Sequence, residues 1–148
     1  MAVRVQTQDF EAGAEIARLR ATDNGVGAIA AFIGTVRDVN DAATVTGLTL
    51  EHYPGMTEAA LEEIVAEAHR RFDIRDALVV HRVGALAPGD QIVLVVVTSA
   101  HRGTAFEACE FVIDYLKTRA PFWKKERLPD GERWVEARSS DDEAAQRW

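Results

Sequence analysis

Basic side chains that suit anion chemistry are concentrated in one part of the sequence, between residues 101 and 125. They are His101, Arg102, Lys117, Arg119, Lys124 and Lys125. The chain of 148 residues is nevertheless acidic as a whole, with a net charge of −7. Cations gathered in one place repel one another unless a bound anion compensates their charge. We therefore predict a pocket for a small, negatively charged substrate.

His101 and Arg102 come where a buried strand is predicted to pass into a helix. The first turn of a helix offers unpaired N–H groups and the positive end of the helix dipole, and an arginine binds phosphate through two hydrogen bonds. The segment therefore suits a phosphate site. Taken alone, it fits an ordinary helix start with a solvated arginine and a half-buried histidine at least as well.

Lys117 and Lys124 are candidates for acid–base or nucleophilic chemistry. If the helix that ends near Lys117 packs on the strand that contains Lys124, the two amines face one space and their repulsion lowers the pKa of one of them. Lys125 then points to the opposite face of that strand, because neighbouring strand residues alternate. The ordinary alternatives are an ion pair of Lys117 with Asp114 and a pair of solvated lysines on an edge strand.

The elements that position these residues follow from hydrophobic periodicity and turn residues. Strands are predicted over residues 3–6, 26–37, 45–53, 77–83 and 91–98, and helices over residues 10–20, 57–72 and 104–117. Two further strands, 122–127 and 132–137, form a predicted hairpin, and the acidic tail after residue 139 has a helical composition. The fold class is α+β, with a mixed or antiparallel sheet, about three helices and this C-terminal β-hairpin.

Several of these segments carry more specific expectations. The strand 26–37 is expected to be mostly buried and to pair with 45–53. The strands 77–83 and 91–98 are rich in β-branched residues and barely alternate, so we expect both of their faces to be covered. Thr57 is the expected cap of the second helix. The expected core stripe of the third helix consists of Phe106, Cys109, Ile113 and Leu116.

The composition excludes several classes of protein. A net charge of −7 argues against binding nucleic acid over a broad surface and against an anionic membrane as partner. The single cysteine, Cys109, permits no internal disulfide and no multi-cysteine metal site, and His52 and His81 lack a metal-ligand partner at useful spacing. The longest apolar runs, 26–33 and 92–97, are far shorter than the roughly 20 residues of a membrane span. We expect a soluble, cytoplasmic protein without a metal or cofactor.

Nearly the whole chain beyond residue 25 resembles the MoaE family, the large subunits of molybdopterin synthases. The matching segments are GTVRD (34–38), LTLEHYPGMTEAAL (48–61), HRVGALAPGD (81–90), TSAHR (98–102), FEACEFVIDYLKTRAPFWKKE (106–126), DGERWVEAR (130–138) and AAQRW (144–148). The resemblance implies an α/β-hammerhead fold in a single domain over residues 1–148. It also implies a homodimer at the centre of a heterotetramer, with a small ubiquitin-like subunit at each end.

The resemblance further implies the activity. In the family, the Gly-Gly C-terminus of the small subunit carries a thiocarboxylate, and two sulfur transfers from it convert cyclic pyranopterin monophosphate into molybdopterin. By position in the motifs, Lys117 and Lys124 match catalytic lysines, and whether Lys117 acts as an acid–base or covalently stays open. The matching substrate-binding positions are Thr35, Val36, Arg37, His101, Arg102, Lys125, Glu126 and Arg138. Some of these groups reach the pocket across the dimer interface in the family.

A competing interpretation belongs to another class of protein. The same fold without catalysis would serve as a phosphate-ligand or partner-binding module. Such a module would tolerate the loss of Lys117 and still need its anion-binding groups.

Overall fold

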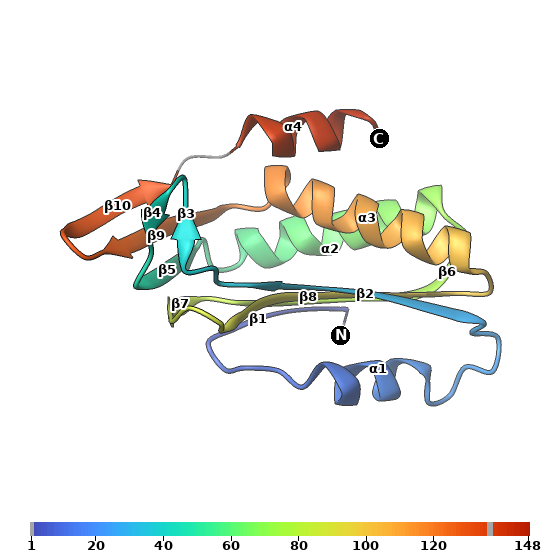
Figure 1. Ribbon diagram of the computed structural model, residues 1–148. Coiled ribbons are helices and arrows are strands. Elements are labelled where there is room, and N and C mark those ends of the chain that lie inside the picture. The colour runs from blue at the N-terminus through green and yellow to red at the C-terminus, as the bar shows by residue number, and fades with distance from the viewer. Residues whose placement is uncertain (1, 136–137) are drawn as a thin grey trace.

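Two neighbouring strands, β6 (Ile74–Arg82) and β8 (Gln91–Ser99), form the centre of the apolar core. In the computed structural model, which describes residues 2–135 and 138–148, Val95, Val96 and Val97 are fully buried. Because successive strand residues point to opposite faces, a run of buried valines requires cover on both faces of the sheet. Helices provide that cover on both sides, which confirms the expectation from the sequence (Figure 1).

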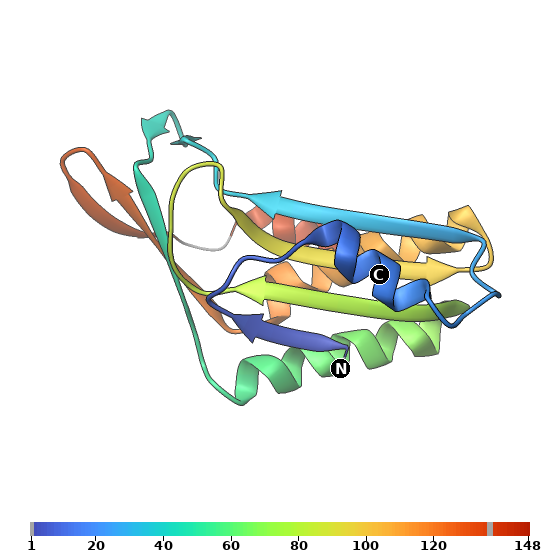
Figure 2. The same ribbon diagram turned by 90° about the horizontal axis from the view of Figure 1, so that it is seen from below.

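The larger sheet has the strand order β1-β6-β8-β2, with β1 (Val3–Gln6) parallel to β6 and the other pairs antiparallel. Helices α2 (Met56–Arg71) and α3 (Arg102–Arg119) cover one face, and α1 (Ala12–Arg20) covers the other (Figures 1 and 2). The fold class is therefore α+β with a mixed sheet, as predicted.

A second sheet lies at one end of the first (Figure 1). Its strands, in spatial order, are β10 (Gly131–Val135), β9 (Phe122–Leu128), β5 (Gly47–His52) and β7 (Gly84–Leu86). A two-stranded ribbon, β3 (Val39–Asn40) and β4 (Ala43–Thr44), stands beside it. The predicted hairpin is present as β9 and β10, and residues 136–137 of the predicted second strand lie outside the described residues.

The strand β2 (Ala28–Thr35) differs from its expectation in both burial and pairing. It lies at the edge of the larger sheet (Figure 2). Only Ala30 of its residues is buried, whereas Ile29, Phe32 and Ile33 are exposed. It pairs with β8, whereas β5 pairs with β9 and β7 in the other sheet. The ribbon β3–β4 separates β2 from β5, so the two strands never meet as a local hairpin.

The helices show three further corrections. The described residues contain four helices where about three were expected, because the tail forms α4 (Ser139–Gln146). Phe106 is 67% exposed, and Phe111, on the face of α3 turned to the sheet and α2, is fully buried. Thr57 lies inside α2, where its hydroxyl donates to the Pro121 carbonyl (3.0 Å) and accepts from the Tyr53 N–H (3.0 Å).

The last two residues of the chain fix the tail helix α4 to α3 and to the end of α2. The Trp148 indole N–H donates to the Asp114 carboxylate (2.7 Å), and the ring packs edge-on against Phe72 and Phe111. Arg147 forms ion pairs with Glu110 and Asp114. Within the described part of the chain, no helix has the length and apolar character needed to cross a membrane.

Candidate active site

A pocket of about 420 Å³ lies where the second sheet, the end of α3 and the start of α4 meet. Five segments supply the polar and charged parts of its wall. They are the end of β2 with the following loop (Thr35, Arg37), the β3 end (Asn40), the β6 end (His81), the α3 end and β9 (Lys117, Lys124, Glu126), and the α4 start (Arg138, Asp141). Apolar side chains such as Val36, Leu48 and Phe122 complete the wall. A pocket of this size and composition suits a small anionic ligand.

Lys117 and Lys124 face this one pocket, as the sequence predicted for a helix packed against the FWKK strand. Lys117 lies in the last turn of α3, and Lys124 lies on β9, whose residues Phe122, Lys124 and Glu126 all point inward. Burial lowers the pKa of Lys124 to about 8, and the charge and hydrogen bond of Lys117 add to the shift. Asp114 forms an ion pair with Arg147. This pair takes the place of the Lys117–Asp114 ion pair that the sequence offered as an ordinary alternative.

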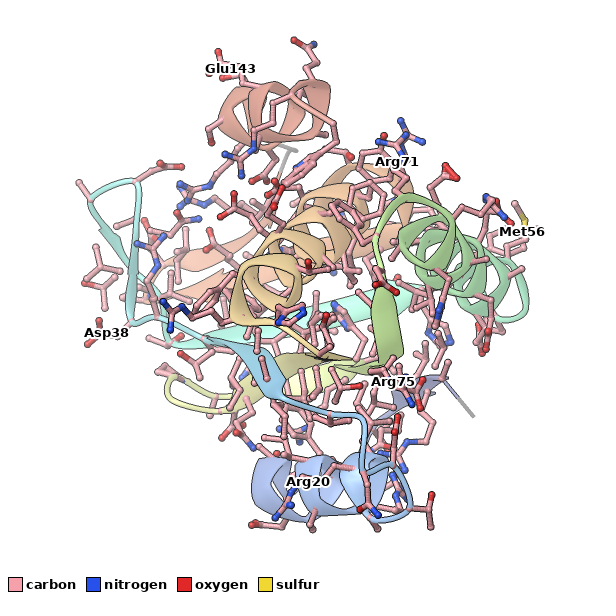
Figure 3. The ribbon with its side chains drawn as sticks, turned by 90° about the vertical axis from the view of Figure 1, so that its right-hand side faces the viewer. Arg20, Asp38, Met56, Arg71, Arg75 and Glu143 are labelled. Carbon is pink, nitrogen blue, oxygen red and sulfur yellow. The ribbon has the colours of Figure 1, made fainter. Side chains whose placement is uncertain are left out.

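The residues after β2 lie at the same pocket. Thr35 and Arg37 are exposed on its wall, and Val36 is buried with its N–H donating to the Asp90 carbonyl (2.9 Å). That hydrogen bond fixes the backbone from which Arg37 projects. Asp38 follows on the flank of the molecule opposite α2 (Figure 3). The loop therefore presents one guanidinium group at the pocket rim.

Lys125 and Glu126 have different surroundings, although both are predicted substrate-binding residues. Lys125 points to the outer face of the hairpin, where its Nζ lies 3.5 Å from the Glu132 carboxylate and 4.9 Å from the centre of the Trp134 ring. Glu126 lines the pocket but is buried, and its carboxylate accepts hydrogen bonds from Arg133 (2.9 Å) and Asn40 (2.8 Å). The alternation of the strand predicted the outward direction of Lys125.

His101 and Arg102 lie away from the pocket of their own chain. Both are exposed at the start of α3, and Lys117 is in its last turn. A helix rises 1.5 Å per residue, so His101 and Lys117 are about 24 Å apart along the axis. A pocket that contains both sets of residues therefore needs a second copy of the chain.

His81 and Asn40 are two of the pocket residues that the sequence did not mark as functional. His81 is buried on β6, with its ring stacked on Phe122 (centroids 3.8 Å apart) and its Nδ1 2.8 Å from the Arg82 carbonyl oxygen. Burial lowers its pKa to about 3, with the nearby Lys117 and Lys124 contributing, so the imidazole is neutral. The second of these residues, Asn40, bridges Glu126 and Arg138 through hydrogen bonds. A single polar residue in a strand or turn has no local signal that marks it as part of a pocket.

Cys109 has no place in this site. It is buried on α3, and burial raises the pKa of its thiol to about 11. A thiol of that pKa is almost entirely protonated at neutral pH and is a poor nucleophile. Over the described ranges, no three His, Cys, Asp or Glu side chains are grouped so as to hold a metal ion.

Comparison with known proteins places this geometry in a family. The family model described as MoaE protein matches residues 5–119. A molybdopterin synthase catalytic subunit from Ralstonia nicotianae is 62% identical over 146 residues, which cover 99% of this chain and 83% of the relative. The chain belongs to the MoaE family. The family resemblance seen in the sequence is thereby confirmed.

Solved structures extend the MoaE likeness to the whole fold. The molybdopterin biosynthesis MoaE protein from Burkholderia ambifaria matches with a TM-score of 0.86 and 60% identity, covering 100% of this chain and 98% of that one. A chain from the complex of subunits 1 and 2 of the molybdopterin-converting factor from Helicobacter pylori has a TM-score of 0.76 at 20% identity, covering 93% and 92%. The latter likeness concerns the fold alone.

Proposed function

We propose that this MoaE family member is the catalytic subunit of a molybdopterin synthase. It converts cyclic pyranopterin monophosphate into molybdopterin by two sulfur transfers from the C-terminal thiocarboxylate of a small ubiquitin-like subunit. The observation that carries the proposal is the pairing of Lys117 and Lys124 in one pocket that also contains Arg37 and Arg138. The relative from Ralstonia nicotianae, 62% identical, is named as a catalytic subunit of this enzyme.

The cationic groups suit the charges of the proposed reactants. The cyclic phosphate is anionic, and its opening develops further negative charge, which Arg37 and Arg138 are placed to stabilise. In each transfer the thiocarboxylate sulfur forms a C–S bond to a carbon of the pterin side chain, and that carbon loses a C–O bond. The oxygen leaves with the phosphate in one transfer, as the cyclic phosphate opens, and as water in the other. Water then cleaves the bond between the sulfur and the small subunit, which leaves a carboxylate on that subunit. Lys117 is the proposed proton donor and acceptor for these steps. Lys124 keeps most of its charge near neutral pH and is placed to neutralise the incoming thiocarboxylate.

A homodimer is part of the proposal, and the open edge of β2 supports it. Ile29, Phe32 and Ile33 are 37%, 37% and 41% exposed on this edge strand, which pairs on one side only with β8 among the described residues. Apolar residues on an unpaired strand edge invite pairing with another chain. A second copy of this chain related by a two-fold axis is the simplest occupant.

Antiparallel pairing of β2 with its copy would also bring His101 and Arg102 to a pocket, namely that of the other chain. The start of β2, Ala28, lies beside Ser99, close to these two residues, whereas its end, Thr35, lies at the pocket. A two-fold axis at the middle of β2 places the start of one strand beside the end of the other. The partner's His101 and Arg102 then approach the pocket that contains this chain's Lys117.

The test is a single-turnover reaction of purified protein with cyclic pyranopterin monophosphate and thiocarboxylated small subunit. We expect dithiolene product from the wild type and at least a hundredfold slower transfer from Lys117→Ala, since loss of a positioned proton-transfer group costs about two to four orders of magnitude. Wild-type turnover by Lys117→Ala would contradict the assignment. A wild type that binds the pterin and forms no product would instead favour the binding module. We also propose that the protein is cytoplasmic, and cell fractionation tests this location.

A further inference from the structure

Asn40 connects the pocket arginine to a buried carboxylate. Its Nδ2 donates to Glu126 Oε2 (2.8 Å), and its Oδ1 accepts a hydrogen bond from the Arg138 guanidinium. Its backbone carbonyl accepts a third bond, from Arg133 (3.1 Å), which also donates to Glu126 Oε1 (2.9 Å). Four segments of the chain meet in this network: β3, β9, β10 and the start of α4.

Asparagine is the side chain that this position requires. A carboxylate such as Glu126 only accepts hydrogen bonds, and a guanidinium such as Arg138 only donates them. The side chain between them must donate on one side and accept on the other. The amide of Asn40 does both, and its two partners fix the direction in which the amide points. Aspartate at this position would place an acceptor against the acceptor of Glu126.

Glu126 serves in this network as an anchor. Its side chain is 7% exposed, and Arg133 and Asn40 each bond to one of its two oxygens. Buried carboxylates with both oxygens bonded hold their partners firmly, because releasing them leaves a charge without hydrogen bonds. Glu126 is therefore occupied by protein groups and is suited to holding Asn40 in place.

The turn that carries Asn40 is held in a costly conformation. Asp41 and Ala42, the two residues between β3 and β4, have φ angles of 50° and 63°. Residues with a Cβ adopt this left-handed region at an energetic cost, and such strain persists only where surrounding contacts fix the backbone. The hydrogen bond that Asn40 donates to Glu126 and the one that its backbone carbonyl accepts from Arg133 are contacts of this kind.

We infer that Asn40 is a positioning residue that holds the Arg138 guanidinium at the pocket, so that the substrate phosphate meets a preorganised cation. Arg138 is otherwise exposed at the start of a short helix, and a free arginine would lose side-chain entropy on binding. This inference rests on the proposed function for the identity of the anion. It adds to the site a residue that acts through Arg138.

The test is a double-mutant cycle on the equilibrium binding of cyclic pyranopterin monophosphate to the full-length protein. We expect Asn40→Ala and Arg138→Ala each to raise the dissociation constant about tenfold, and the double variant to be no weaker than Arg138→Ala alone. Asn24→Ala, an exposed turn asparagine near Arg75 at the other end of the sheet, is the matched control and should bind as the wild type does.

Three results would overturn the inference: unchanged binding by Asn40→Ala, losses that multiply in the double variant, or no binding of the pterin by the wild type. A merely structural role predicts losses that multiply. Asn40→Ser, too short to reach both Glu126 and Arg138, replaces Asn40→Ala in the cycle if the alanine variant does not fold.

Single turnover of the same proteins separates the inference about Asn40 from the proposed function. A wild type that binds pterin without forming product contradicts the function and leaves the coupling measurable.

Discussion

Lys124 holds a positive charge in a half-buried position, and this combination carries a cost in stability. Burial and the neighbouring Lys117 lower its pKa to about 8 from the ordinary value of 10.5. Below pH 8 the folded protein must hold the charge that the unfolded chain exposes to water. The folded protein releases this proton more readily than the unfolded chain does between pH 8 and 10.5, so stability rises with pH across that window.

Replacing the amine with an apolar side chain should therefore stabilise the fold while removing function. We expect Lys124→Met to raise the free energy of unfolding by roughly 1–2 kcal/mol at pH 7, with the gain shrinking as the pH rises from 8 to 10.5. Urea unfolding at several pH values measures this. Lys125→Met is the matched control, because Lys125 lies on the outer face of the same strand. Equal gains for both variants at every pH would contradict the burial of Lys124.

At the residue scale, strand alternation and family motifs predicted several of the charged residues that line the pocket. Alternation placed Lys124 and Lys125 on opposite faces, and the motifs led to Arg37 and Arg138 at the pocket wall. They did not lead to Asn40, whose partners Glu126 and Arg138 are 86 and 98 residues away in sequence. Contacts at such separations follow from the tertiary structure, and no local pattern encodes them.

At the scale of elements, α4 depends on the last residue of the chain, Trp148. It is eight residues long, and an isolated helix of that length is unstable in water. Trp148 supplies the missing stability through its bond to Asp114 and its edge-on packing against Phe72 and Phe111. Because Arg138 and Asp141 line the pocket, the position of α4 also determines part of the site.

Trp148→Ala should therefore loosen α4 and weaken pterin binding together. We expect amide hydrogen exchange in residues 140–146 to become at least about tenfold faster, while exchange in β6 and β8 changes little. Glu143→Ala is the control, since Glu143 lies on the outer side of α4 (Figure 3). Unchanged exchange in α4 of Trp148→Ala would show that the helix is held by other contacts.

The elements themselves were predicted more accurately than their partners. The valine-rich runs of β6 and β8, the periodicity of α2 and the turn before β10 are local signals, and each identified its element. The pairing of β5 with β9 joins residues 70 to 80 positions apart, so turn residues gave no indication of it. Phe106 has the right spacing for the core stripe of α3, but the helix turns Phe111 toward the sheet.

At the scale of the whole molecule, the exposed edge of β2 is the feature that a single chain leaves unexplained. The sequence of β2 is apolar enough to suggest a buried strand, yet Ile29, Phe32 and Ile33 face outward. A dimer built on this edge would bury these side chains and bring the partner's His101 and Arg102 to the pocket. For the single chain, the prediction that this strand is mostly buried is wrong.

The central claim is that one site combines Lys117 of one copy with Arg102 of the other, and subunit mixing tests it most directly. Two differently tagged chains, Lys117→Ala and Arg102→Ala, are co-expressed and the doubly tagged dimer is purified through both tags. Each variant alone should be nearly inactive in sulfur transfer. A two-fold dimer with shared sites leaves one of its two sites intact, so we expect about half of wild-type turnover.

The reciprocal dimer pairs a chain that carries both substitutions with a wild-type chain. Shared sites predict almost no turnover from it, because each site then contains one substitution. If each site is instead formed within one chain, the results are reversed: the first dimer is inactive, and the second retains about half of wild-type turnover. That reversal, or a failure to recover any doubly tagged dimer, would contradict the account.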